Sequence, residues 1–299
     1  MTLTQRNIEI DSEVWTRLKI EATNRNKNVR EFAGDILSDY LRNKKLEVKT
    51  KPKVIILAAG QTNRLIPFTN NLPACMLEIN GKTILQRLLD TFKGCGLNDI
   101  SVVKGYKKSA IKYPNIKYYY NKNYKNNRTL ESLFCANSEM NNEFIVSYAD
   151  ILVDVSVVNR LLESTADISL VVDVQWLEHY KDRYHHPIEE AEKVVVENER
   201  IKKIGKIINP NETHGEFIGL IKFSKKGAEI LKENYRRITK DYTINKPFHT
   251  AISLEKAYLT DMIQELIDRG YLVSNVDVTG GWVEIDTIED LKITQKIIK

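Results

Sequence analysis

The stretch that decides the fold is Lys53 to Phe68, "KVIILAAGQTNRLIPF". Its apolar run stops at Gly60, and polar residues and Arg64 follow. A short, continuous apolar run is typical of a strand buried on both faces of a parallel sheet. Ligands of such sheets bind at the carboxyl ends of the strands, where a loop of small residues leaves backbone N–H groups open to a ligand. Arg64 can fold back from this loop to grip phosphate oxygens, although an ordinary turn with a surface arginine is the alternative.

From Lys53 onward, strand-like and helix-like segments alternate, which predicts an α/β fold. The strand-like segments are residues 99–106, 143–154, 166–174, 192–206 as a hairpin, 216–224 and 272–278. The helix-like segments are residues 83–96, 130–140, 225–235 and 259–270, and the chain closes with residues 280–299. We therefore expect one domain over residues 53–299, built on a doubly wound, mixed but mostly parallel sheet.

Residues 1–45 form a separate unit, joined by a basic, polar linker at 46–52. Alternating residues up to Ile10 predict a short strand, and apolar residues spaced along one face predict two amphipathic helices. The residues of these helical faces are Val14, Leu18, Ala22, Phe32, Ile36 and Leu41. So short a unit cannot bury a core, so we expect it to pair with a second copy. It resembles a ribbon-helix-helix module, which implies a homodimer or DNA binding; Glu9 would face phosphate, so dimerisation is favoured.

Composition excludes several classes of protein. The 299 residues are 42% hydrophobic and 28% charged, and a net charge of +5 does not by itself indicate a nucleic-acid partner. Three cysteines without a CxxC pair favour a reducing compartment over a disulfide scaffold or a zinc site. We find neither a signal peptide nor an apolar run of roughly 18 residues, so a cytoplasmic protein without a membrane partner is expected.

The run "LAAGQTNRLIPFTNNLPACMLEINGKTIL", Leu57 to Leu85, resembles the signature of nucleotidyltransferases that load sugar phosphates, phosphocholine and phosphonates onto a nucleotide. That signature reads LAAG-x-G-x-R-L-x-P-x-T, then P-K-x-L and G-K-P-I-L. The positions that match are Leu57 to Gly60, Arg64, Leu65, Pro67, Thr69, Pro73, Gly81, Lys82, Ile84 and Leu85.

The likeness extends over residues 53–299. Segments 214–231, 257–270 and 280–291 are similar to the cytidylyltransferase-like domain associated with phosphoenolpyruvate phosphomutase. The resemblance implies a nucleotide-diphospho-sugar transferase-like fold. It also implies transfer of a nucleotidyl group, CMP from CTP above other nucleotides, to a small phosphate- or phosphonate-bearing acceptor with release of pyrophosphate.

This reaction brings two anions together, and the attacking oxygen is already charged. The site must therefore supply cations and Mg²⁺ rather than a general base. The resemblance makes Asp150, at the end of the strand "EFIVSYAD", and Asp286, before the last helix, the two metal ligands. Taken without it, Asp150 is a turn residue and Asp286 an N-cap with Glu289 at N3.

Further site residues follow from the loop and from the resemblance. The expected catalytic residues are Arg64, Lys193 and Asp150. The expected nucleotide-binding residues are Leu57, Ala58, Ala59, Gly60, Thr62, Arg64, Lys82 and Arg128. Tyr124 and Glu216 are expected to contact the acceptor. Lys193 is equally interpreted as a solvated lysine, and Glu216 as a strand-edge residue. Ser132 is more typical of a helix residue. The adjacent His185 and His186 indicate a solvated loop.

Two positions depart from the signature. Thr62 replaces its second glycine, which narrows the room for a triphosphate. Ala74 replaces its lysine, whose ammonium would neutralise reacting phosphates. Four interpretations remain open: compensation by Lys82, Lys193 or Arg128; a weak enzyme; a nucleotide-sensing DNA-binding regulator; or an engineered lysine-to-alanine variant.

Overall fold

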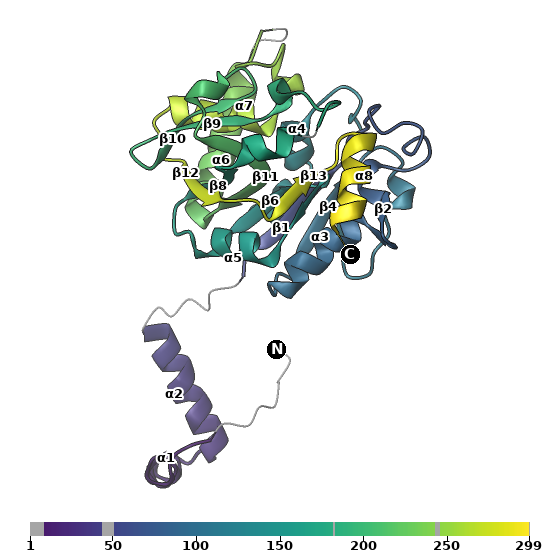
Figure 1. Ribbon diagram of the computed structural model, residues 1–299. Helices are drawn as coiled ribbons and strands as arrows, with labels where there is room; N and C mark the ends of the chain where they lie inside the picture. Colours follow the sequence, from purple (N-terminus) through teal and green to yellow (C-terminus); the bar gives the residue numbers. More distant parts are fainter. Residues whose placement is uncertain (1–8, 44–50, 182, 243–245, 299) are drawn as a thin grey trace. The chain divides into compact units, whose positions relative to one another are not determined.

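The chain divides into two compact units, Met1–Thr50 and Lys51–Lys299 (Figure 1). The computed structural model describes residues 9–43, 51–181, 183–242 and 246–298. In the described part of the chain, no helix is both long and apolar enough to cross a membrane.

The first unit contains two helices, α1 (Ser12–Asn24) and α2 (Val29–Asn43), as the sequence predicts. Asp11 begins α1, because its side chain accepts hydrogen bonds from the backbone N–H groups of the first turn. Ala22 and Phe32 are buried. The strand expected up to Ile10 lies mostly outside the described residues, and Glu9 and Ile10 themselves are not in a strand.

Much of the apolar face of the first unit is exposed, as expected of a unit too short to bury a core alone. Val14 is 49% exposed, and Ile36 and Leu41 are each 43% exposed. Two helices of 13 and 15 residues offer too little surface to cover one another. The helices are confirmed, while their pairing with a second copy stays a prediction.

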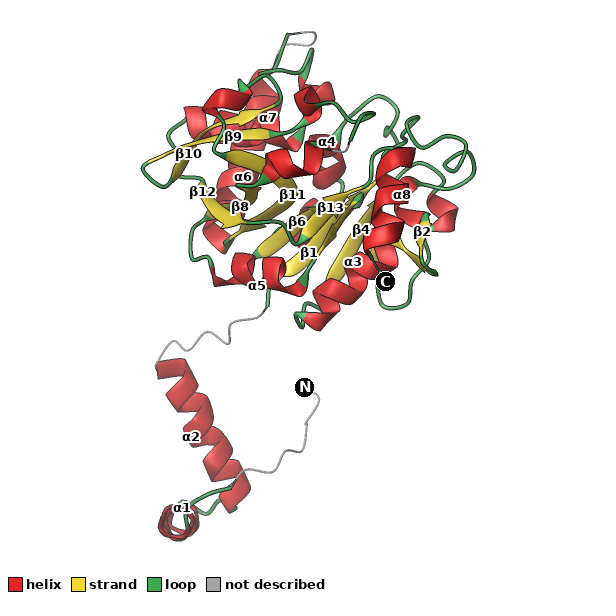
Figure 2. Cartoon of the chain, in the orientation of Figure 1, coloured by secondary structure: helices red, strands yellow, loops and turns green. Residues whose placement is uncertain are grey.

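The second unit is built on a nine-stranded mixed sheet (Figure 2). Its strands are β1 (Lys53–Ala58), β4 (Ile100–Lys104), β5 (Lys117–Tyr120), β6 (Phe144–Tyr148), β8 (Ile168–Asp173), β9 (Lys193–Glu197), β10 (Arg200–Gly205), β11 (Gly215–Phe223) and β12 (Ser274–Val278). The order is β10-β9-β11-β6-β1-β4-β5, and β8 lies between β11 and β12. Of these described strands only β10 and β11 run against β1, so the sheet is mostly parallel, as expected.

Both faces of the sheet are covered by helices, which makes the fold doubly wound. The helices are α3 (Ile84–Gly94) and α5 (Val155–Glu163) on one face, and α4 (Thr129–Phe134), α6 (Lys225–Asp241) and α7 (Leu259–Asp268) on the other. Val54 and Ile56 of β1 pack with the first group, and Ile55 and Leu57 with the second. This alternation explains the continuous apolar run, since both sides of β1 are buried.

Two small antiparallel pairs complete the fold. β2 (Glu78–Ile79) pairs with β3 (Lys82–Thr83), and β7 (Ile151–Val153) pairs with β13 (Trp282–Glu284). The second pair holds the end of the chain against the strand that follows β6, and the N–H of Ile285 donates to the carbonyl of Asp150 at 2.9 Å. The last helix, α8 (Ile288–Ile297), begins just beyond it.

Several element boundaries differ from the expectation. The segment 143–154 is not one strand, because the chain turns between β6 and β7 at Asp150. The helix expected over 130–140 ends at Phe134, and the helix expected to end at Tyr235 continues to Asp241. The hairpin expected over 192–206 is confirmed as β9 and β10.

Candidate active site

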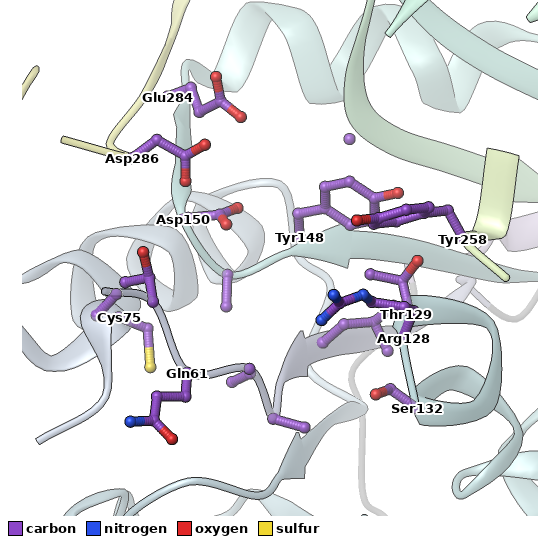
Figure 3. A pocket seen from close by; sticks show the side chains of 18 of the residues that line it. Gln61, Cys75, Arg128, Thr129, Ser132, Tyr148, Asp150, Tyr258, Glu284 and Asp286 are labelled. Atoms are coloured by element: carbon purple, nitrogen blue, oxygen red, sulfur yellow. The ribbon is translucent and has the colours of Figure 1, made fainter. Parts of the chain in front are cut away.

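A cavity of about 530 Å³ opens at the carboxyl ends of β1 and β6 (Figure 3). Its size suits a small-molecule site. The ionisable side chains that line it are those of Asp150, Glu190, Glu192, Glu216, Glu284, Asp286, Arg64, Lys125, Arg128 and Lys206. In Figure 3, Glu284, Asp286 and Asp150 gather on one side, with Tyr148, Tyr258 and Arg128 on the other.

The loop after β1 forms one wall of this cavity. Its lining residues include Leu57, Ala58, Ala59, Gly60, Thr62 and Arg64. A Cβ built on Gly60 would meet nothing within 4 Å, so the space beside this backbone is open rather than filled by the protein. Such a bare backbone can approach a phosphate closely. The loop residues expected to bind nucleotide therefore share one cavity.

The side chain of Arg64, in the same loop, pairs with an acid from the end of the chain. Its guanidinium donates to the Asp286 carboxylate at 2.5 Å, and 41% of the arginine side chain is exposed. The arginine expected to hold phosphate therefore pairs with the aspartate expected to bind metal. An exposed guanidinium with one short ion pair can exchange its partner for another anion.

Two further carboxylates, those of Asp150 and Glu284, lie beside this pair. Asp150 Oδ1 is buried and has no hydrogen-bond partner among the described residues. Burial and the neighbouring Asp286 raise the pKa of Asp150 to about 7, and burial and Asp286 also raise the pKa of Glu284. Clustered acids of this kind repel one another until a cation neutralises them. The donor set is all oxygen, which is what Mg²⁺ prefers, so these residues fit a divalent ion.

Asp286 faces the cavity because a different residue caps the last helix. Thr287 is the N-cap of α8, and its hydroxyl accepts from the Asp290 N–H at 3.2 Å. The Asp290 carboxylate in turn accepts hydrogen bonds from the backbone N–H groups of Thr287 and Asp286. The alternative that made Asp286 the cap and Glu289 its N3 partner is wrong, because the capping box lies one residue later.

A buried cluster anchors these acids from behind. Arg183 donates to Asp290 at 2.7 Å and lies 3.5 Å from Glu284. His186 is 2% exposed and lies between the same two acids. The reading of His186 as a solvated loop residue is wrong, whereas His185 is exposed. His186, Glu284 and Asp286 could also hold a metal ion, since their ligand atoms lie within 4.8 Å of one another.

Two lysines that we expected in the site, Lys82 and Lys193, are not among the described residues that line the cavity. Lys82 is exposed and forms an ion pair with Asp90 at 2.9 Å. Lys193 is buried, but its ammonium donates to the backbone carbonyls of Ile188 and Ala191 at 3.3 and 3.1 Å. Lys193 is neither solvated nor placed to meet a phosphate, so the structure contradicts its role as a catalytic cation.

Other cations occupy the cavity wall. Arg128 is there as expected, its guanidinium carbon 5.8 Å from the centre of the Tyr258 ring. Lys206 was not anticipated; its ammonium pairs with Glu190 at 2.6 Å. Ala74 lies in a short 3-10 turn, Ala74–Met76, and also lines the cavity, so the missing lysine leaves space within the site itself.

The residues expected to meet an acceptor line the cavity too. Tyr124 and Glu216 both do, and Glu216, the second residue of β11, is 4% exposed. Ser132 lies in α4, as expected, and reaches the cavity as well. Burial raises the pKa of Glu216 to about 7, and the same holds for Glu192, which was not anticipated.

Tyr148 belongs to the floor of the cavity because of a glycine on the next strand. Gly219 of β11 has φ +85°, and a Cβ there would lie 2.8 Å from the Tyr148 ring. The register of β11 against β8 shifts at this point, between Phe217 and Ile221. Glycine therefore permits both the bulge and the close approach of the ring.

The cavity-lining residues that the sequence analysis missed include Tyr148, Glu190, Glu192, Lys206, Tyr258, Trp282 and Glu284. They come from separate strands and loops and carry no common spacing. Glu284 alone had an available signal, because it precedes Asp286 by two residues and side chains alternate in period two along a strand.

The similarity of this chain to known proteins agrees with this geometry. The family described as the MobA-like NTP transferase domain matches residues 54–204, about half of the chain. The chain belongs to this family. It is therefore a nucleotidyltransferase of the fold expected, and the matched region contains the β1 loop and Asp150.

Relatives extend the match. A CTP:phosphoglutamine cytidylyltransferase of Campylobacter jejuni is 32% identical over 252 residues, covering 80% of this chain and 97% of that protein. A choline-phosphate cytidylyltransferase of Streptococcus pneumoniae is 32% identical over 117 residues, covering 38% of this chain and 51% of that protein. The structure of the inositol-1-phosphate CTP transferase from T. maritima aligns with a TM-score of 0.63 at 23% identity, over 82% of this chain and 95% of that one, which supports the fold.

Proposed function

We propose that this nucleotidyltransferase transfers CMP from CTP to a small phosphate- or phosphonate-bearing acceptor and releases pyrophosphate. One observation supports this most directly: Asp150 and Asp286, far apart in the sequence, line one cavity with the open loop at Gly60. CTP is favoured over other nucleotides because the C. jejuni and S. pneumoniae relatives are cytidylyltransferases. Both relatives are also named for acceptors that carry a phosphoryl group.

In this proposal each group acts on charge rather than on a proton. The backbone of Ala59 and Gly60 cradles phosphate oxygens, and Arg64 leaves Asp286 to bind them. Asp150 and Asp286 hold Mg²⁺, with Glu284 beside them. When bound, the ion neutralises phosphate oxygens as negative charge develops. The acceptor oxygen is already an anion, so no side chain is needed as a general base.

The first unit is proposed to pair two chains. Val14, Ile36 and Leu41 are large apolar side chains that the described chain leaves exposed, and a second copy would cover them. Sedimentation of the full chain and of Ile36→Glu tests this: we expect a dimer that the variant converts to a monomer. The alternative of a nucleotide-sensing DNA-binding regulator gains no support from the relatives described above, which are transferases.

Pyrophosphate release measured with each of the four NTPs tests the reaction. Phosphocholine, 2-aminoethylphosphonate and other small phosphate esters serve as acceptors, with Mg²⁺ present. We expect CTP to be used at least about tenfold faster than the other nucleotides. The absence of pyrophosphate with every nucleotide and acceptor, together with salt-dependent DNA binding, would overturn the proposal in favour of the regulator.

A further inference from the structure

The cavity contains a buried carboxylate whose hydrogen bonding is incomplete. Glu216 is 4% exposed, and its Oε1 accepts from the Tyr180 hydroxyl at 2.7 Å. Its Oε2 is buried and has no hydrogen-bond partner among the described residues. A buried carboxylate oxygen without a donor is costly. The cavity wall therefore contains a hydrogen-bond acceptor, Glu216 Oε2, to which no described protein group donates.

Glu192 adds a second carboxylate with only neutral donors. Its Oε1 accepts from the Thr260 hydroxyl at 3.0 Å and its Oε2 from the Tyr148 hydroxyl at 3.4 Å. Both Glu192 and Glu216 line the cavity. Neutral hydroxyls satisfy the geometry of a carboxylate without neutralising its charge, and the nearby Lys206 ammonium is hydrogen-bonded to Glu190 instead.

The cations that could compensate these acids bind elsewhere. Lys193 lies opposite Glu216 in the register of β9 and β11, yet its ammonium donates to two backbone carbonyls. Lys206 pairs with Glu190 at 2.6 Å, and Arg183 donates to Asp290 at 2.7 Å. Lys206 therefore acts on Glu192, and Arg183 on Glu216, only through space, and no described cation donates a hydrogen bond to either carboxylate.

Aromatic rings complete this part of the cavity. Tyr148, Phe217 and Tyr258 line it, and the rings of Tyr148 and Phe217 meet edge to face with centroids 6.0 Å apart. Aromatic walls pack against methylene groups and attract an organic cation more than a hydrated metal ion. Their presence favours an alkyl ammonium over an inorganic cation.

We propose that Glu216 and Glu192 bind an ammonium group of the acceptor, and that this group carries at least one N–H. The inference rests on the proposed function and specifies its acceptor: a short aminoalkyl phosphate or phosphonate. The positive charge compensates two carboxylates, and the N–H supplies the donor that Glu216 Oε2 lacks. A quaternary ammonium provides the charge but not the donor, so it binds less well.

Three matched acceptors separate these contributions. 2-Aminoethyl phosphate has both charge and N–H; 2-hydroxyethyl phosphate is nearly isosteric but uncharged at that end; phosphocholine is charged without an N–H. We expect kcat/KM with CTP to be at least about a hundredfold higher for the first than for the second. Phosphocholine should fall between them, at least about tenfold below 2-aminoethyl phosphate.

Variants assign the preference to the two acids. Glu216→Gln and Glu192→Gln keep the side-chain shape and remove the charge. We expect each to lower the ratio of kcat/KM between 2-aminoethyl and 2-hydroxyethyl phosphate at least about tenfold. Glu212→Gln is the matched control, since Glu212 is exposed and close in sequence to Glu216; its ratio should equal that of the parent chain.

Binding provides a readout that does not need turnover. Calorimetry compares 2-aminoethyl phosphate and 2-hydroxyethyl phosphate on the parent chain and on Glu216→Gln. A preference for the amine that the variant loses supports the inference even if no pyrophosphate is released, in which case the proposed function alone fails. Turnover without any preference for the amine overturns the inference and leaves the proposed function intact. If there is no turnover and no binding preference for the amine, both the inference and the proposed function are overturned.

Discussion

Arg64 donates to the Asp286 carboxylate at 2.5 Å, although the two residues lie 222 positions apart. The arginine is expected to hold phosphate, and the aspartate is expected to hold a divalent ion. Each residue therefore provides the counter-charge of the other. Binding of a nucleotide together with its metal ion would replace one ion pair by two stronger interactions, so the pair need not be costly to open.

Replacing Arg64 should separate these two roles. We expect Arg64→Gln to lower kcat/KM for CTP at least about a hundredfold, because a cation that stabilises the transferring phosphate is lost. The same variant should bind Mn²⁺ more tightly, several-fold, in the absence of nucleotide, because Asp286 is no longer paired. Kinetics and the paramagnetic resonance of free Mn²⁺ measure the two effects. Unchanged Mn²⁺ affinity would show that the ion pair does not compete with metal.

Asp150→Asn tests the metal-binding role of the other aspartate. We expect turnover to fall at least about a thousandfold, because the amide cannot replace a carboxylate ligand. The thermal unfolding temperature should not fall, because the substitution removes a charge that the neighbouring carboxylates repel. Asp154→Asn is the control, as Asp154 is exposed and makes no capping hydrogen bond. Retained turnover in Asp150→Asn would remove Asp150 from the proposed site.

The sequence predicts those parts of the fold whose signal is local. The apolar run of β1 indicates a strand buried on both faces because its side chains alternate between two cores, and the small residues after it mark the carboxyl end of that strand. The resemblance places Asp150 and Asp286 in one site, which no spacing could have shown. Their shared location depends on the pairing of β7 with β13.

The acceptor side of the cavity could not be predicted in the same way. Glu192 and Lys206 flank the β9–β10 hairpin, and Tyr258 precedes α7. Glu192 and Lys206 meet because β9 pairs with β10, and Tyr258 joins them because α7 packs on β10. Each of the three resembles an ordinary surface residue in the sequence. Lys193, by contrast, was predicted in the site but does not line the cavity. This lysine at the start of β9 was expected to contact a phosphate, but its ammonium donates to backbone carbonyls.

Ala74→Lys tests whether a cation is missing from the site. Ala74 lines the cavity, so a lysine side chain introduced there would extend beside the phosphate-binding loop. We expect kcat to rise at least about tenfold, since an ammonium in such a site stabilises developing charge. Ala74→Met controls for side-chain volume. An equal or lower kcat in Ala74→Lys would mean that Arg64, Arg128 or Lys206 already supplies the charge.

The acceptor preference should depend on pH. Burial raises the pKa of Glu192 and of Glu216 to about 7, so both are charged well above pH 7 and become protonated below it. We expect the ratio of kcat/KM between 2-aminoethyl and 2-hydroxyethyl phosphate to fall about tenfold from pH 8 to pH 6. Using a ratio cancels the titration of the phosphate and of Asp150, which both acceptors share.

Other charged groups face these two acids and set the limits of that profile. They are His179, Tyr180, Arg183 and Lys193 around Glu216, and Tyr148, Lys206 and Asp261 around Glu192. Glu216→Gln tests which group is responsible: it should flatten the profile if Glu216 is, and leave it unchanged if another of these groups is.

Acid stability should depend on Glu139. This 6%-exposed carboxylate binds Lys53 at 2.8 Å, Lys117 at 3.2 Å and the Tyr119 hydroxyl at 2.6 Å. Burial alone would raise the pKa of Glu139, but the hydrogen bonds from Lys53 and Tyr119 outweigh it and lower the pKa to about 2. The folded pKa is below the unfolded value, so this contribution to stability is complete above about pH 4.5 and is lost as the pH falls towards 2.

Urea unfolding of Glu139→Gln at pH 7 and at pH 3 measures that contribution. At pH 7 we expect the variant to lose about 2 kcal/mol, the usual cost of removing a buried, charged hydrogen-bond partner. At pH 3 the difference between the variant and the parent should be smaller, because the unfolded parent chain already binds a proton at Glu139 while the folded chain is still largely ionised. Asp99→Asn removes an exposed partner of the same Lys117 and should cost less at both values. A loss that is equal at the two pH values would indicate that Glu139 acts through packing rather than through its charge.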